Sequence, residues 1–388
     1  MRQRIFHSIS CLLLLAVCAA GQSKPEEESR LEAARAGYER AQNHERSGDW
    51  QQAEREWRAV VELTPSDARA LVNLGVALNR QNRTREALDA WQAAISIAPN
   101  ISGAHFNIGL TLTRNGRYTE AVAPLRRALV LDPANDGARR ALALAFAALE
   151  RFQEASREVA LLLARAPRDA GLLELAAQSF MRQGRFAEAT SVLRRRLDLD
   201  GATGQLWAMY GDALDGAKRT PEAAAAYERA LQLAPESNPT RYGLGYLYWK
   251  LYRYDDAERV LVELLKRDPA DGRAAFTLGD LYLTKGEAAR SLPLLEQAAR
   301  AYPEEFDTRF ALGRALVQTG QHARAAEELR AAVKLNESIA DGHYQLGRVL
   351  MQTGQRDEAK RELERARELN EEKRKAEATR RRQDPSPE

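Results

Sequence analysis

The residue types that carry catalysis are all present in this sequence, but their spacing matches no catalytic motif. There is no glycine-rich phosphate loop, no His-Glu-x-x-His pair and no CxxC pair, and Gly243-Leu244-Gly245 lacks the third glycine of a dinucleotide site. Acidic residues are plentiful, but they are spaced as helix-surface charge, so no pair of carboxylates stands out as an acid–base site. The sequence therefore predicts a protein that is not an enzyme and has no catalytic, cofactor-binding or metal-binding residues.

The N-terminal segment has the layout of a secretory signal. Arg2 and Arg4 precede a short apolar run, Ile9 to Ala20, that ends in small residues and is followed by polar ones. The run is shorter than the roughly 20 apolar residues of a membrane span, so we expect no transmembrane span once the signal is removed. The sequence predicts a signal peptide over residues 1–21 and a polar linker over residues 22–33.

The sequence leaves two forms of the exported protein open. Cleavage at the end of the signal gives a soluble protein that is periplasmic or secreted. In the alternative the protein is lipid-anchored to the envelope, because Leu15-Ala16-Val17-Cys18 partly resembles a bacterial lipoprotein box with Cys18 as the lipidated residue, although Val17 is bulkier than that box prefers. Since Cys11 and Cys18 are the only cysteines, we expect no disulfide in the mature chain.

The rest of the chain is built from a unit of two amphipathic helices, seen most clearly over residues 102–135. Phe106, Ile108 and Leu112 recur at helical spacing, and Gly116 then ends the pattern, because glycine tolerates the positive φ of a helix terminus. A second apolar face runs to Pro133, which lacks the amide that a continuing helix needs. Two such helices cannot close a core alone, so they must stack on copies of themselves.

The copies follow at intervals of 34 residues without an insertion or deletion. The turn after the second helix is marked by Pro65, Pro99, Pro133, Pro167, Gly201, Pro235, Pro269, Pro303, Glu337 and Glu371. This register predicts ten units over residues 34–373. Each helix also carries one small residue, such as Gly245 and Ala257 in the seventh unit, where the two helices are expected to cross closely.

The unit resembles the tetratricopeptide repeat, whose pattern is a bulky residue, Leu-Gly, an aromatic, then Ala, an aromatic, Ala and Pro. The sixth unit shows it in Trp207, Tyr210-Gly211, Ala223, Tyr227, Ala230 and Pro235. Ten units in register make the resemblance specific. It implies an all-α fold, a right-handed α-solenoid of about ten helix-turn-helix repeats, in which the first helices line a concave groove that holds a peptide or a partner helix.

The resemblance places two sets of side chains on this groove. The predicted partner-binding groove, in the C-terminal half, consists of Tyr242, Tyr246, Trp249, Phe276, Phe310, Tyr344, Arg314 and Arg348. Aromatic anchors flanked by arginine are typical of an interface hot spot. The alternative is helix packing, because one of the positions concerned is often aromatic in the family, but that alternative does not readily account for Tyr246 and Trp249.

A secondary basic groove is predicted in the N-terminal units, from Arg46, Asn73, Arg80, Asn107 and Arg114. Arginines repeated at one position suit a carboxylate or an acidic peptide, since a guanidinium group offers paired hydrogen bonds. The alternative is that each arginine pairs with a neighbouring glutamate and only keeps the surface soluble.

Charge and turn chemistry add further expectations. The net charge of +3 argues against bulk binding to nucleic acid or anionic lipid. Residues 201–204 replace the usual proline turn, which indicates either a hinge or an ordinary turn of different sequence, and Arg196 is expected to lay its stem along the surface. Residues 374–388 are predicted to form a polar C-terminal cap followed by a disordered tail from Asp384.

Scarce lysine with abundant arginine and alanine is typical of a GC-rich bacterial genome. With the export signal and the repeats, this predicts a non-enzymatic protein–protein interaction scaffold of the bacterial cell envelope that binds a peptide or partner protein along its groove. The alternative is a recognition or assembly subunit for a separate envelope machine, in pilus, lipopolysaccharide or outer-membrane biogenesis. An enzyme is the least supported alternative.

Overall fold

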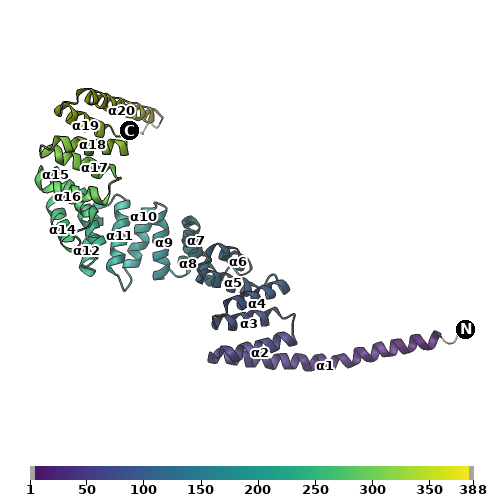
Figure 1. Ribbon diagram of the computed structural model, residues 1–388. Helices are drawn as coiled ribbons and strands as arrows, with labels where there is room; N and C mark the ends of the chain where they lie inside the picture. The colour runs from purple at the N-terminus through teal and green to yellow at the C-terminus, as the bar shows by residue number, and fades with distance from the viewer. Residues whose placement is uncertain (1–4, 384–388) are drawn as a thin grey trace. The chain divides into compact units, whose positions relative to one another are not determined.

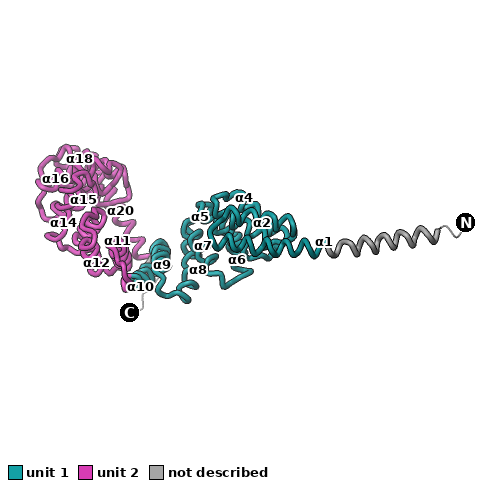
Figure 2. Tube along the Cα trace, turned by 90° about the horizontal axis from the view of Figure 1, so that it is seen from below, with its two compact units in different colours: residues 1–196 teal, residues 197–388 magenta. Residues whose placement is uncertain are grey.

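The computed structural model describes residues 5–383, and it describes side chains from residue 26 to residue 379. Within that range the chain consists of twenty α-helices and contains no strand (Figure 1). The helices belong to two compact units, Met1–Arg196 and Leu197–Glu388 (Figure 2). The predicted all-α architecture of tandem helix pairs is confirmed.

The odd-numbered helices are the first helices of successive repeats, and the even-numbered ones are the second helices. The first unit contains α1 (Ile5–Ser47), α2 (Trp50–Leu63), α3 (Ala68–Arg80), α4 (Thr84–Ile97), α5 (Ser102–Arg114), α6 (Tyr118–Leu131), α7 (Asp136–Ala148), α8 (Phe152–Arg165), α9 (Ala170–Arg182) and α10 (Phe186–Leu197). The second contains α11 (Gly204–Gly216), α12 (Thr220–Leu233), α13 (Asn238–Lys250), α14 (Tyr254–Arg267), α15 (Gly272–Thr284), α16 (Ala288–Ala301), α17 (Phe306–Gln318), α18 (His322–Leu335), α19 (Ala340–Gln352) and α20 (Arg356–Gln383).

Side-chain caps set where several of the first helices begin. The Asp67 carboxylate accepts hydrogen bonds from the amides of Arg69 and Ala70 at 2.9 and 3.3 Å, and Asp271 does the same for the first turn of α15. These amides have no partner within the helix, so the carboxylate satisfies donors that would otherwise be left open.

The turn inside every repeat requires a left-handed residue. A positive φ recurs at Gly48, Asn82, Gly116, Glu150, Gly184, Lys218, Tyr252, Gly286, Gly320 and Gly354. Glycine adopts this conformation without steric cost, whereas a residue with a Cβ atom does not. The repeat geometry therefore imposes the same turn on all ten units, including those whose sequence does not favour it.

The two helices of a repeat cross at the small residues that the sequence singled out. A Cβ atom added at Gly75 would lie 2.3 Å from Nε1 of Trp91, and one added at Gly109 would lie 2.5 Å from Cγ of Leu125. Both distances are shorter than a van der Waals contact, so the close crossing depends on the missing side chain.

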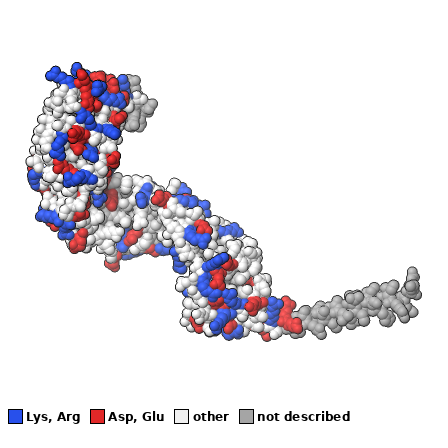
Figure 3. Space-filling model, viewed as in Figure 1, with Lys and Arg blue, Asp and Glu red and all other residues white. Residues whose placement is uncertain are grey.

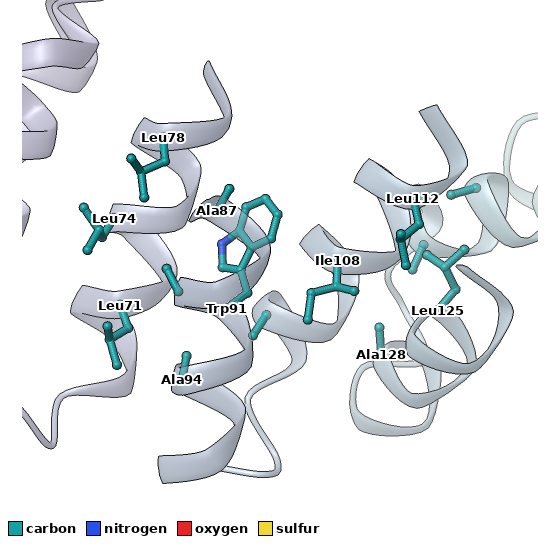
Figure 4. Packing of buried hydrophobic residues seen from close by; sticks show 14 of the residues in the cluster. Leu71, Leu74, Leu78, Ala87, Trp91, Ala94, Ile108, Leu112, Leu125 and Ala128 are labelled. Atoms are coloured by element: carbon teal, nitrogen blue, oxygen red, sulfur yellow. The ribbon is translucent and has the colours of Figure 1, made fainter. Parts of the chain in front are cut away.

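Within the first unit, one hydrophobic core continues from Ala41 to Ala155 across successive repeats. Figure 4 shows Trp91 in the middle of the second repeat, between Leu74 of α3 and Ile108 of α5. Trp91 is fully buried, and its indole nitrogen donates a hydrogen bond to the carbonyl oxygen of Val72 at 2.9 Å. Because each repeat covers the apolar face of its neighbour, burial accumulates along the chain without a single central core.

Arg196 pairs with the first helix of its own repeat. Its side chain is only 11% exposed, and its Nε lies 2.6 Å from Oε1 of Glu174, whose side chain is 41% exposed, so a largely covered stem carries the charge to a partner at the surface. The two compact units divide directly after Arg196. In the following turn Gly201 has a φ of 79° and the Thr203 hydroxyl caps α11. Whether residues 201–204 form a hinge stays a prediction.

Several expectations for the termini fall outside the described side chains. These are the signal peptide over residues 1–21 and the lipidation site Cys18, while the predicted disordered tail from Asp384 lies outside the described residues altogether. At the C-terminal end, α20 continues to Gln383, past the last residue of the tenth repeat, 373. No helix in the described part of the chain combines the length and the apolar character needed to cross a membrane.

Candidate functional site

In the second unit, the first helices of successive repeats lie directly against one another. α13 contacts α15, α15 contacts α17, and α17 contacts α19, in addition to the contacts that each makes with second helices. This places side chains of one repeat position in a row along the surface that the first helices share. We call this surface the first-helix face.

On α13, at one end of the first-helix face, three aromatic rings stack in a row. The ring centroids of Tyr242 and Tyr246 are 6.3 Å apart, those of Tyr246 and Trp249 are 5.7 Å apart, and both pairs have an interplanar angle of 24°. Tyr242 and Trp249 are half-buried, while Tyr246 is 38% exposed. Spacings of four and three residues put all three rings on one side of the helix. This aromatic row presents a rigid apolar surface to solvent.

Side chains of α15 hold both ends of the aromatic row. The guanidinium carbon of Arg273 lies 4.6 Å from the centroid of the Tyr242 ring, a cation–π contact. At the other end the indole of Trp249 lies close to the Asp280 carboxylate. Burial raises the pKa of Asp280, and the charge of Arg314 together with the polar indole of Trp249 offsets only part of that rise.

Arginines flank aromatic rings in the last two repeats, as the sequence predicted. Arg314 lies 5.9 Å from the Phe310 centroid, and Arg348 lies 5.8 Å from the centroid of Tyr344, which is 46% exposed. Phe276 and Phe310, by contrast, are half-buried and pack against the hydrophobic core of the second unit. These two phenylalanines therefore contribute to packing as well as to the surface.

A pocket of about 330 Å³ adjoins the aromatic row between α11, α12 and α13. Tyr242 and Tyr246 line one side, and Asp212 and Tyr227 line the other. The Tyr227 hydroxyl donates a hydrogen bond to Asp212. The pocket walls desolvate Asp212 and raise the pKa of its carboxyl, which the Tyr227 hydrogen bond offsets only in part. Gly243 permits this arrangement, because a Cβ atom there would lie 2.5 Å from the Tyr227 ring.

Sequence reasoning missed the two carboxylates of this face, although the register could have found them. Asp212, Tyr246, Asp280, Arg314 and Arg348 occupy the same position in five successive repeats. Only Tyr246, Arg314 and Arg348 were selected from the sequence, because a single aspartate on a helix resembles ordinary surface charge. The complete series runs from acidic at α11 to basic at α17 and α19.

The three arginines of the predicted basic groove are all exposed. Among the described residues none of them forms an ion pair with a carboxylate, which goes against the alternative of neighbour pairing. Arg46 instead donates to the Asn43 side-chain oxygen at 2.5 Å, and Arg80 lies 5.4 Å from the Trp50 centroid.

The two asparagines of the basic groove are half-buried, and one of them is engaged. Asn73 donates a hydrogen bond from its side-chain nitrogen to the Tyr38 hydroxyl at 3.2 Å, whereas Asn107 forms no side-chain hydrogen bond within the described part of the chain. Arg46, Arg80 and Arg114 thus offer, at one repeated position, guanidinium groups that have no carboxylate partner among the described residues.

Figure 3 shows basic and acidic side chains interspersed on the visible face of each unit. Within the side chains that are described, no three histidine, cysteine, aspartate or glutamate residues come together in a way that could hold a metal ion.

Comparison with family models identifies the repeats. Models described as tetratricopeptide repeat match residues 38–101, 80–136, 106–171, 140–201, 174–238, 242–305, 277–338 and 340–373. The chain belongs to the tetratricopeptide repeat family. A search of curated protein sequences finds no match.

Several solved structures are similar to parts of the chain. MamA 41-end from Desulfovibrio magneticus RS-1 is 21% identical over 45% of this chain and 98% of its own, with a TM-score of 0.42. YrrB, described as a TPR protein with an unusual peptide-binding site, is 20% identical over 47% of this chain and 93% of its own, with a TM-score of 0.42. The Naa15/Naa10 complex bound to HypK-THB is 16% identical over 88% of this chain and 63% of that chain, with a TM-score of 0.47.

Proposed function

We propose that this tetratricopeptide repeat protein is a non-enzymatic scaffold that binds a peptide or partner protein along the first-helix face of its second unit. The observation that carries the proposal is the aromatic row Tyr242, Tyr246 and Trp249. Three stacked rings with one edge open to solvent and arginines further along the face have the composition of an interface hot spot. Pure helix packing does not require Tyr246 to be exposed.

The charge series along this face suggests the chemistry and direction of the ligand. Asp212 lies beside the aromatic row at α11, whereas Arg314 and Arg348 lie beyond it on α17 and α19. A ligand with a basic group near its α11 end and an acidic group near its α19 end would place opposite charges together. We propose an extended segment with an apolar or aromatic centre between two such groups.

The exposed arginines of the first unit form a second candidate surface. Arg46, Arg80 and Arg114 recur at one position of α1, α3 and α5 and lack carboxylate partners among the described residues. A guanidinium group with free donors favours a carboxylate ligand. We propose that this surface binds an acidic segment, of the same partner or of another.

The cellular setting of the proposal is the bacterial cell envelope. Residues 1–21 support export, to the periplasm or to the medium, with lipid anchoring at Cys18 as the alternative. Service as a recognition or assembly subunit of a separate envelope machine is compatible with the same first-helix face. Analysis of neighbouring genes separates this second role from a free-standing scaffold.

The proposal is tested by capture of partners from an envelope extract with three forms of the full chain. These are the unaltered protein, the double variant Tyr246→Ala/Trp249→Ala, and the control Tyr252→Ala. Tyr252 is 78% exposed in the turn after α13, so it offers an aromatic residue outside the aromatic row. We expect at least one protein to be captured by the unaltered chain and the control but lost from the double variant.

The affinity of that protein should then fall by roughly 2 kcal/mol or more in the double variant, the scale of an interface hot spot. Equal capture by all three forms would show that the first-helix face of the second unit is not the binding surface. Equal loss from the double variant and from Tyr252→Ala would count against the proposal in the same way.

A further inference from the structure

The fourth residue of the first helix contacts the preceding turn in several repeats. Arg139 donates to the carbonyl oxygen of Pro133 at 2.9 Å, and Arg309 donates to that of Pro303 at 3.1 Å. Arg241 makes the same contact with Pro235 at 2.7 Å. In each case the partner carbonyl is six residues earlier, so one side chain satisfies an acceptor that the turn leaves open.

Elsewhere in the chain this residue also has an acidic partner 19 residues later, on the second helix. Arg139 pairs with Glu158 and Arg309 with Glu328, each at 2.7 Å, and His343 pairs with Glu362 at 2.6 Å. The residue 19 positions after Arg241, where the acidic partner would stand, is Val260. The seventh repeat therefore keeps the cation and lacks the carboxylate.

The missing partner leaves Arg241 in an unusual state. Its residue surface is only 8% exposed, and its Nη1 atom is buried without a hydrogen-bond partner in the described structure. Burial, together with the charge of Arg267, lowers the pKa of Arg241, and the charges of Glu263 and Glu236 offset only part of that effect. A buried cation with an open donor costs free energy unless an acceptor reaches it.

A pocket of about 580 Å³ opens at this position, between α12, α13 and α14. Leu231, Leu244 and Val260 supply apolar walls, and Arg241, whose Nη1 is a buried donor without a partner among the described residues, also lines the pocket. Residues 241 and 244 lie on a different side of α13 from the aromatic row, because they are offset from it in the helical repeat. The pocket is therefore separate from the first-helix face.

The other charged side chains around the pocket already have partners. Glu228 accepts a hydrogen bond from the Tyr248 hydroxyl at 2.6 Å. Arg253 and Arg259 each pair with Asp256 at 2.7 Å, and Glu263 pairs with Arg267 at 3.2 Å. Among the described arginines that line the pocket, Arg241 is the one that forms no ion pair, although the charges of Glu263 and Glu236 act on it at longer range.

We propose that this pocket binds a carboxylate group with a small apolar body, with the carboxylate on Arg241 where Glu158, Glu328 and Glu362 stand in other repeats. The apolar part lies against Leu231, Leu244 and Val260. A carboxylate that accepts from a buried guanidinium group gains more free energy than the same contact does in water. The carboxylate belongs either to a free short-chain acid or to a glutamate side chain of a partner.

The test is a titration of the full chain with butyrate, followed through the methyl NMR signals of the pocket residues Leu231, Leu244 and Val260. Butyramide, which has the same shape without the charge, is the matched ligand control. We expect butyrate to shift these signals and butyramide to leave them unchanged. Equal shifts with both compounds would overturn the proposal.

Two variants and one control assign the effect to the missing carboxylate. Val260→Glu supplies the glutamate that other repeats have, so it should raise the melting temperature and weaken butyrate binding at least about tenfold. Arg241→Gln should weaken binding by a similar factor. Arg309→Gln removes the corresponding arginine of a repeat that already has its glutamate, so it should leave butyrate affinity unchanged. Unchanged binding in Val260→Glu would refute the proposal even if Arg241→Gln does not fold.

A second ligand distinguishes the two sources of the carboxylate. Glutamate with both its amino and its α-carboxyl group capped stands in for a side chain of a partner. Tighter binding of butyrate assigns the pocket to free acids, and tighter binding of capped glutamate assigns it to an acidic side chain. Either result supports a carboxylate site. If neither ligand binds, the pocket is not a carboxylate site.

Discussion

Gly245 of α13 and Leu261 of α14 touch so closely that a Cβ atom on Gly245 would lie 2.7 Å from Cδ2 of Leu261. Gly245→Leu should therefore overpack this crossing and destabilise the protein by about 1 to 3 kcal/mol. Because repeats contact only their neighbours, hydrogen exchange should show protection lost first in the seventh repeat and then outward. Uniform loss across all repeats would contradict this nearest-neighbour account.

Glu150 adopts a φ of 57° at the turn position where most repeats have glycine. Glu150→Gly should stabilise the protein by about 1 kcal/mol, because glycine relieves the steric cost of a left-handed residue. The matched control is Gly184→Ala at the same position of the next repeat, where φ is 71° and stability should fall. Thermal denaturation measures both, and shifts of the same sign would argue against a conformational origin.

Trp249 and Phe276 should respond differently to truncation, although both were selected as groove residues. Trp249→Ala removes an anchor of the aromatic row, so binding should weaken by roughly 2 kcal/mol with little change in melting temperature. Phe276 packs against the core, so Phe276→Ala should lower the melting temperature clearly, although by less than the about 3 to 5 kcal/mol of a fully buried phenylalanine.

Circular dichroism melts and an affinity measurement on these two variants separate binding from packing. A large drop in melting temperature for Trp249→Ala, with unchanged affinity per folded molecule, would remove the aromatic row from the binding surface. Equal effects of the two truncations on affinity would instead extend the hot spot to Phe276.

Glu54 should make the stability of the first unit depend on pH. Its partial burial favours the neutral form, but hydrogen bonds from Arg58, Gln81 and Arg83 outweigh this and lower the pKa of its carboxyl. A lowered folded-state pKa stabilises the fold above the unfolded-state value of about 4.3. That stability is lost as the pH falls from there through the folded-state pKa.

Glu54→Gln tests this contribution. The variant should be less stable than the unaltered chain at neutral pH, and the gap should close in acid. Urea unfolding at a series of pH values gives the comparison, and a gap that is constant with pH would assign the loss to packing.

Export is tested on the mature protein. Mass spectrometry should find an N-terminus near Gly21 or Gln22, or else a lipidated Cys18. A chain that retains Met1 in the cytosolic fraction would contradict the prediction.

The aspects of the structure that follow from the sequence are those in which one repeat resembles the next. The interval of 34 residues, the left-handed turn at Gly116 and the small residue at Gly109 recur in register, so each can be read from several copies at once. The same register placed Tyr246 and Trp249 on the first-helix face. Contacts within a repeat and with its neighbours account for the fold, and such contacts leave a periodic signal.

Only the tertiary structure decided what happens where a repeat departs from the others. It showed that Arg196 pairs with Glu174, that Phe276 packs against the core, and that Asp280 meets Trp249 of the preceding repeat. It also showed that Arg241 is buried with no carboxylate partner among the described residues. The position at which other repeats supply that carboxylate holds Val260. Each of these depends on side chains that meet across helices, and their distances and burial leave no periodic pattern in the sequence.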